Sequence, residues 1–133
     1  MPDGMQIVRG YERPQVDRPK AVVRLAKSDI VDVQVQWVGD GGANNLHSHT
    51  GNDGFWLVLA GRARFHGDGD ELVAELGPHE AVLVPRGTRY WFESAGEDEL
   101  EILHVKAKAL GEKDRRIDHR DRAGVSIAAG ASD

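Results

Sequence analysis

The sequence predicts an all-β domain, built as an antiparallel barrel or sandwich. Short apolar runs follow one another at close spacing, and turn-forming residues lie between them, among them many of the 16 glycines. This pattern is typical of many short strands joined by tight turns. The clearest strand is Asp29–Val38, where valine or tryptophan alternates with polar residues, the period of a strand that buries one face. The 133 residues fit one domain.

Taken in order, the chain divides into an arm, a barrel and a tail. Residues 1–19 contain three prolines and many charges, which favours an extended N-terminal arm. Residues 108–133 are dense in charge and lack a sustained apolar stripe, so we expect a charged C-terminal tail or a short helix. Residues 20–107 hold the expected barrel strands: Lys20–Ala26, Asp29–Val38, Leu46–Thr50, Gly54–Gly61, Arg62–Gly67, Glu71–Leu76, Ala81–Pro85, Arg89–Ser94 and Leu100–Ala107.

Composition excludes several classes of protein. The formal net charge of −5 argues against a broad nucleic-acid surface, which needs clustered positive charge. The absence of cysteine rules out disulfides and thiolate metal sites. The N-terminus lacks the apolar core of a signal peptide, and no apolar run approaches the ~20 residues of a membrane span. We therefore expect a cytoplasmic protein without nucleic-acid or membrane partners.

Two short motifs point to a more specific fold. Residues 41–49 read glycine, five residues and then the H-x-H pair His47 and His49, and Gly61 follows at the distance of a closing glycine. Residues 85–87 read P-x-G, as in a second motif. In these features residues 41–96 resemble the cupin superfamily. The resemblance implies a double-stranded β-helix, or jelly-roll, barrel with a metal site built from both motifs.

Three departures from the cupin pattern concern the usual site residues. Gly54 stands at the position of the glutamate in the first motif. Tyr90 stands at the position of the histidine in the second motif, and Ser94 replaces its asparagine. Of the four ligands that the resemblance implies, His47 and His49 are present at their places.

The two histidines suit a metal ion in their chemistry and their spacing. Residues i and i+2 of a strand share a face, so His47 and His49 are expected to project together into the barrel. Neutral imidazoles bind transition metals such as Fe, Ni or Zn, and the resemblance adds Mn. Two protein ligands rarely hold a divalent ion well, and catalytic zinc sites usually supply three. A third ligand is therefore needed.

Asp53 is the first candidate for that third ligand, since two histidines and a carboxylate make the facial triad of non-haem iron oxygenases. A regular strand would turn Asp53 to the other face, so a bulge at the neighbouring glycines would be required. The alternative is that the carboxylate accepts backbone N–H bonds in the turn that enters the strand.

Tyr90 and His104 are the other candidates. Tyr90 could bind the metal once deprotonated, act as a catalytic hydrogen-bond donor to a substrate oxygen, or simply pack. His104 alternates with Leu100 and Ile102 in the last strand. If this set faces inward, His104 is a metal ligand or catalytic residue; otherwise it is a structural histidine.

Three further residues are predicted to bind substrate. Trp56 and Phe92 share the inward parity of Gly54 and Tyr90, so they line an aromatic cavity for a small organic ligand or pack in the core. Arg89 flanks the mouth of the site, where its guanidinium could bind a substrate carboxylate bidentately.

Two functions remain open at this stage. The first is a metal-dependent enzyme, a dioxygenase, isomerase or cyclase that holds Fe, Ni, Mn or Zn on His47 and His49. The second is a non-catalytic module that binds a small metabolite and has lost or weakened its metal site. The resemblance also implies a homodimer that pairs through the N-terminal arm.

Overall fold

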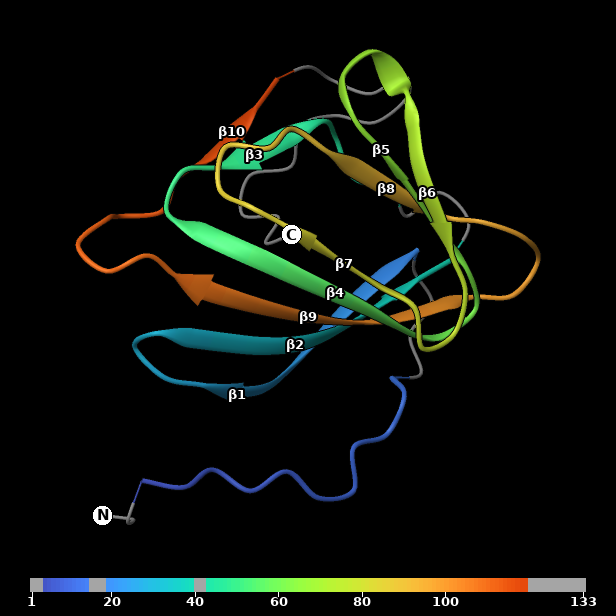
Figure 1. Ribbon diagram of the computed structural model, residues 1–133. Coiled ribbons are helices and arrows are strands. Elements are labelled where there is room, and N and C mark those ends of the chain that lie inside the picture. The colour runs from blue at the N-terminus through green and yellow to red at the C-terminus, as the bar shows by residue number, and fades with distance from the viewer. Residues whose placement is uncertain (1–3, 15–18, 40–42, 120–133) are drawn as a thin grey trace.

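The computed structural model describes residues 4–14, 19–39 and 43–119, and it confirms the all-β class (Figure 1). The described residues form ten strands and one 3₁₀ turn: β1 Lys20–Lys27, β2 Val31–Val38, β3 His47–His49, β4 Asn52–Ala60, β5 Ala63–His66, η1 Asp68–Asp70, β6 Leu72–Leu76, β7 Ala81–Val84, β8 Trp91–Ser94, β9 Leu100–Lys108 and β10 Arg116–Asp118. They include no helix with the length and hydropathy that a membrane crossing requires.

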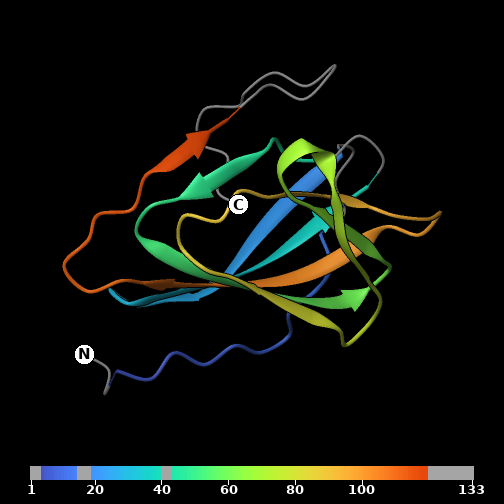
Figure 2. The same cartoon turned by 45° about the horizontal axis from the view of Figure 1, so that its top comes forward.

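The strands form two opposed layers (Figures 1 and 2). One layer is a five-stranded antiparallel sheet in the order β1-β2-β9-β4-β7. The opposite layer holds the three-stranded sheet β6-β5-β8 and the strand pair β10-β3. An antiparallel bridge between His47 and Tyr90 joins these two parts, since each backbone N–H donates to the other's carbonyl at 3.0 and 2.9 Å.

The hydrophobic core fills the space between the layers. Trp56 and Val58 of β4 and Leu100 and Ile102 of β9 are fully buried, and they belong to one cluster with Phe92 of β8. The Trp56 and Phe92 rings pack with centroids 4.8 Å apart. These residues alternate along their strands, as the period-2 pattern predicts. The interior is thus largely filled by side chains.

Gly61, the closing glycine of the first motif, makes the turn from β4 to β5. Its φ is +80°, in the left-handed region that favours glycine. A Cβ at this position would lie 2.5 Å from the carbonyl oxygen of Glu99, just before β9. Both backbone conformation and close approach therefore require glycine here.

The N-terminal arm runs along the side of the five-stranded sheet that faces away from β5, β6 and β8 (Figures 1 and 2). The Tyr11 hydroxyl donates to the Glu101 carboxylate at 2.6 Å, and burial and this bond raise the pKa of the phenol. The Arg13 guanidinium pairs with Glu99 and lies 3.8 Å from the ring centroid of Trp37. These contacts tie the arm to the outer face of the sheet.

The C-terminal segment differs from its sequence-based expectation. Instead of a solvated tail or short helix, Arg116–Asp118 forms β10, which pairs antiparallel with all three residues of β3. Figure 2 shows β10 beside β3 at the edge of its layer. No apolar pattern marks this strand, because β10 extends an edge and contributes no residue to the main core. Residues 120–133 lie outside the described part of the chain.

Candidate functional site

His47 and His49 lie on β3, the short strand between β10 and the Tyr90 bridge. Both are buried, and their ring centroids are 5.3 Å apart with the rings nearly perpendicular. The H-x-H spacing thus brings two imidazoles together on one face.

Hydrogen bonds fix the tautomer of both rings. His47 Nδ1 lies 2.7 Å from the carbonyl oxygen of Asn45, which can only accept, so Nδ1 carries the proton. His49 Nδ1 lies 3.0 Å from Oδ2 of Asp114 and donates to that carboxylate in the same way. With Nδ1 as the donor, the neutral form of each ring has its lone pair on Nε2. Metal-binding histidines are usually oriented by such bonds to a carbonyl or carboxylate.

Asp114 is a site residue that the sequence analysis did not find. Burial alone would raise the pKa of its carboxyl, but hydrogen bonds from the Gly51 N–H and from His49 lower it below its ordinary value. The Gly51 bond is 3.0 Å long. A carboxylate that stays ionised is a strong acceptor for the His49 N–H. The only sequence signal was its place in a charge-dense segment, which does not distinguish it from its neighbours.

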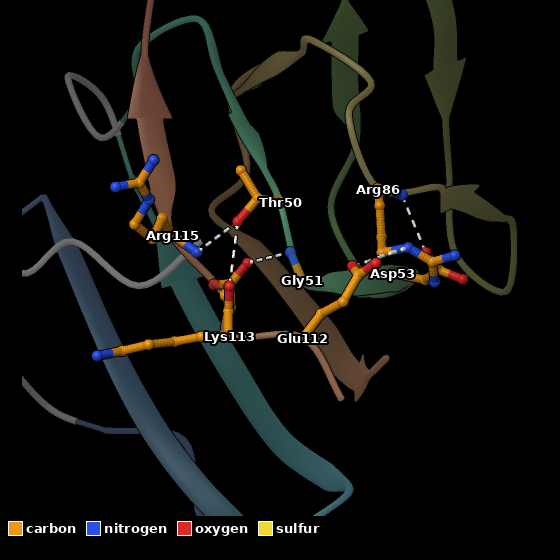
Figure 3. Close-up of polar contacts among 8 residues, drawn as sticks. Thr50, Gly51, Asp53, Arg86, Glu112, Lys113 and Arg115 are labelled. Carbon is orange, nitrogen blue, oxygen red and sulfur yellow. Dashed lines mark hydrogen bonds and ion pairs between the residues drawn. The ribbon is translucent and has the colours of Figure 1, made fainter. Parts of the chain in front are cut away.

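The segment around Asp114 is tied to the end of β3 by further bonds (Figure 3). The Thr50 hydroxyl accepts from the Arg115 N–H at 2.8 Å and donates to the Lys113 carbonyl at 3.3 Å. Beyond β10, His119 Nε2 lies 2.8 Å from the hydroxyl of Ser48. Burial, and then the charge of Arg89, lower the pKa of His119. The residues after β9 thus form the outer support of the histidine pair.

His104 faces inward from β9 together with Leu100 and Ile102, which is one of the two orientations that the sequence left open. Its ring stacks on Trp56 with centroids 3.5 Å apart and planes within 8°. Its Nε2 lies only 3.1 Å from the point that a Cβ on Gly54 would occupy. The imidazole of His104 therefore takes up the space into which a side chain at position 54 would extend.

Tyr90 also reaches the site. Its ring centroid is 4.5 Å from that of His47, and the ring belongs to the buried core. Tyr90, His49 and His104 line one small cavity with Asn52, Gly54, Val84, Pro85 and Thr88. The cavity volume is about 10 Å³, which corresponds to a single water-sized atom.

The remaining predicted residues lie elsewhere. Asp53 accepts from the backbone N–H of Arg86 at 2.9 Å and pairs with the Arg86 guanidinium at 3.3 Å (Figure 3), so its carboxylate binds the turn after β7 and not the turn that enters its own strand. Arg89 is half exposed, 3.6 Å from Asp68. Phe92 and Trp56 pack in the core, so the structure offers no open aromatic cavity between them.

The imidazole nitrogens of His47, His49 and His104 are of the kind that binds transition metals, but they do not converge on one point. Within the described ranges, no three His, Asp or Glu side chains are grouped closely enough to hold an ion as they stand. His47 and His49 present Nε2 lone pairs, and His104 lines the same cavity as His49. These three imidazoles are the residues that would hold a transition metal.

Comparison with known proteins identifies the family. The family model described as "Cupin domain" matches residues 34–106, more than half of the chain. The chain is a cupin. The matched residues include β3, β4 and most of β9, and with them His47, His49, Tyr90 and His104. No curated protein sequence matches this cupin significantly.

Solved structures confirm the double-stranded β-helix fold. A protein of that fold from Klebsiella pneumoniae aligns with a TM-score of 0.66 and 17% identity, over 79% of this chain and 84% of that one. A cupin superfamily protein from Desulfitobacterium hafniense aligns with 0.61 and 22%, over 72% and 84%. KdgF from Halomonas sp. aligns with 0.60 and 18%, over 74% and 89%. At these identities the similarity establishes the fold alone.

Proposed function

We propose that this cupin acts on a small molecule at the His47–His49 site, with a divalent transition metal held by Nε2 of His47, His49 and His104. When bound, Fe, Ni, Mn or Zn would supply Lewis acidity or oxygen activation, as in a dioxygenase, isomerase or cyclase. The hydrogen bonds at Nδ1 direct the lone pair of each neutral ring to Nε2, which supports His47 and His49 as metal ligands.

The observation that carries the proposal is the relation between His104 and Gly54. In the cupin pattern the residue at position 54 is the glutamate ligand, and here glycine supplies no side chain. His104 Nε2 lies 3.1 Å from where the Cβ of a side chain would begin. A nitrogen donor from β9 thus stands where a carboxylate from β4 would extend. The missing glutamate is thus replaced by a histidine of the neighbouring strand β9, which keeps a third donor at the site.

The other residues of the site hold the donors in place. The Asn45 carbonyl and the Asp114 carboxylate orient His47 and His49 through Nδ1. Trp56 stacks on His104 and restricts its ring to one plane. Tyr90 lines the cavity, and its hydroxyl would donate a proton or hydrogen bond to a substrate there.

A second candidate function is a cupin that binds its ligand without a metal. It is favoured by the finding that no described group of three acidic or histidine side chains is assembled as it stands. His47, His49 and Tyr90 would then serve as hydrogen-bonding and acid–base groups alone.

Metal content separates the two functions. We expect untagged protein reconstituted with Fe(II), Ni(II), Mn(II) or Zn(II) to retain one ion per chain after gel filtration, measured by elemental analysis. His47→Ala, His49→Ala and His104→Ala should each lose it, because two imidazoles hold a divalent ion poorly. His79→Asn is the matched control, since His79 is exposed and its φ of +70° is tolerated by asparagine. Absence of retained metal in the unaltered protein would leave the metal-free function.

We also propose that the chain forms a homodimer through the arm and the outer face of the five-stranded sheet. Met5, Ile7 and Val8 of the arm are exposed, and so are Phe55 and Leu83 on the sheet. Exposed apolar side chains on the arm and on the sheet favour association. Light scattering at micromolar concentration is expected to give the mass of two chains, and a monomeric mass would contradict the proposal.

A further inference from the structure

We infer that residues 109–119, here named the strap, are a gate: they close the outer side of His49 and swing away from β3 when a ligand enters. Either candidate function requires a ligand to reach the histidine pair. This conformational step therefore goes beyond the proposed function and holds for both candidates.

The closed site leaves no room for a ligand. His47 is fully buried, and His49 is only 8% exposed. The cavity that His49 shares with Tyr90 and His104 has a volume of about 10 Å³, enough for one water-sized atom. Part of the surrounding structure must therefore move before an organic ligand can bind next to these rings.

The strap is the part of the site with the weakest apolar hold. The hydrophobic core cluster includes no residue of 109–119. The two large apolar side chains of the strap, Leu110 and Ile117, are 86% and 39% exposed. Hydrogen bonds attach the strap instead, in the β10–β3 ladder and in the contacts of Figure 3. A segment with few buried apolar contacts opens at a lower free energy than the core strands.

The loop 85–89 on the other side of the cavity is held more firmly. The residues that flank it, Val84 and Tyr90, both belong to the core cluster. The Gly87 N–H also donates to the carbonyl oxygen of His49 at 2.9 Å. Movement of this loop would pull on the core, whereas the strap can leave β3 without disturbing it.

The strap has a pivot where it leaves β9. The chain turns there between Ala109 and Glu112, and the Glu112 N–H donates to the Ala109 carbonyl at 3.3 Å. Gly111 in this turn has a φ of +80°, and nothing lies within 4 Å of its would-be Cβ. A glycine in open space can change its backbone angles without collision. Figure 2 shows the segment extending beyond the end of β9 before it returns to β3.

His49 stands between the cavity and the strap. Its ring lines the cavity, and its Nδ1 lies 3.0 Å from Oδ2 of Asp114 in the strap. When the strap leaves, this bond and the 2.8 Å bond between Ser48 and His119 both break. The His49 ring can then rotate outward, which opens the cavity to solvent. The chemical reactivity of His49 therefore reports whether the strap is open or closed.

A disulfide that locks the strap tests the inference, since the chain has no cysteine of its own. Ser48 and Ile117 lie opposite each other in the β3–β10 register. Their Cα atoms are expected to be about 5.5 Å apart, a separation that a disulfide spans. The protein used is metal-stripped Ser48→Cys/Ile117→Cys, either oxidised or reduced and then freed of reductant. The probe is diethyl pyrocarbonate, which modifies neutral imidazoles, and labelling is followed by peptide mass spectrometry.

We expect His49 to be labelled at least about tenfold more slowly in the oxidised form than in the reduced form, because the lock suppresses local opening. His79 is exposed and should be labelled equally in both forms, which makes it the internal control. Equal labelling of His49 in the two forms would overturn the inference. So would a reduced form in which His79 is labelled and His49 is not.

Hydrogen exchange of the unaltered protein covers the case in which the double variant folds poorly. The Thr50 N–H donates to the Arg115 carbonyl at 3.0 Å, and the His119 N–H donates to the Leu46 carbonyl at 2.8 Å. These amides should exchange at least about tenfold faster than those of β9, since only strap opening is needed to expose them. Equal protection of the two sets would contradict a strap that opens independently. Both measurements use metal-free protein, so a failure to retain metal would remove the metal-dependent function and leave this inference standing.

Discussion

Replacing Asp114 by alanine is expected to lower the affinity of this cupin for a divalent metal by about 10- to 100-fold, the usual cost of removing a group that orients a metal-binding histidine. Asp114 would not touch the ion. Its carboxylate holds the Nδ1–H of His49 at 3.0 Å, so its loss frees the ring to rotate and removes the bond that fixes its tautomer. The measurement is a competitive titration of Zn(II) or Mn(II) against a chelating dye.

Two matched variants define this prediction. Asp114→Asn keeps a side-chain oxygen that can accept from His49, so most of the affinity should remain. Asp118→Ala removes a carboxylate on β10 that pairs with Arg116 instead, and should leave the affinity unchanged. If Asp114→Ala binds metal as tightly as Asp118→Ala, Asp114 has no orienting role.

Gly51→Ala provides an independent route to the same effect. A Cβ on Gly51 would lie 2.6 Å from the backbone nitrogen of Asp114 and 2.8 Å from the carbonyl carbon of Lys113. Backbone atoms cannot turn aside as a flexible side chain can, so the segment must move away from β3. We expect a loss of metal affinity close to that of Asp114→Ala, although every titratable group is still present.

Gly61→Ala is expected to reduce the free energy of unfolding by about 2–5 kcal/mol. A left-handed conformation costs a non-glycine residue about 1–2 kcal/mol. Overlap of the new Cβ with the Glu99 carbonyl, at 2.5 Å, adds about 1–3 kcal/mol. Urea unfolding followed by tryptophan fluorescence measures the change.

Gly96→Ala is the control that separates these two contributions. Gly96 also has a positive φ, +88°, but nothing lies within 4 Å of its would-be Cβ. It should therefore show the backbone cost of about 1–2 kcal/mol without the overlap. Equal losses in the two variants would show that the close approach of the β4–β5 turn to Glu99 is unimportant.

Much of the fold could be predicted from the sequence because buried strands leave a period-2 pattern. The strand assignments around Val31 and Ile102 followed from that pattern, and so did the shared inward face of His47 and His49; the strand around Trp56 was assigned from a continuous apolar run. The histidines, Trp56 and Ile102 face the core, whereas in β2 the inner face carries Gln34 and Gln36, opposite His104 and Ile102 of β9.

The features that the sequence did not predict depend on contacts between distant segments. The segment that holds Asp114 and β10 has no apolar alternation. Nothing local therefore distinguished Asp114 from the other acidic residues near it. Trp56 and Phe92 were expected to line a cavity, but inward-facing side chains fill the interior of a barrel this small. The role of Asp53 depended on the backbone N–H of Arg86, 33 positions later in the chain.

The pairing of β3 with β10 also has a consequence for biosynthesis. The bond between His49 and Asp114 joins residues 65 positions apart, and that between Ser48 and His119 spans 71. At roughly 5–20 residues per second, a ribosome needs about 3–13 seconds to add the residues between His49 and Asp114. Until then the nascent chain can assemble β4 and its neighbours, but His49 lacks its carboxylate partner. The histidine site would thus be completed after most of the barrel, and a chain that terminates before Asp114 would lack the group that orients His49 even if its barrel folds.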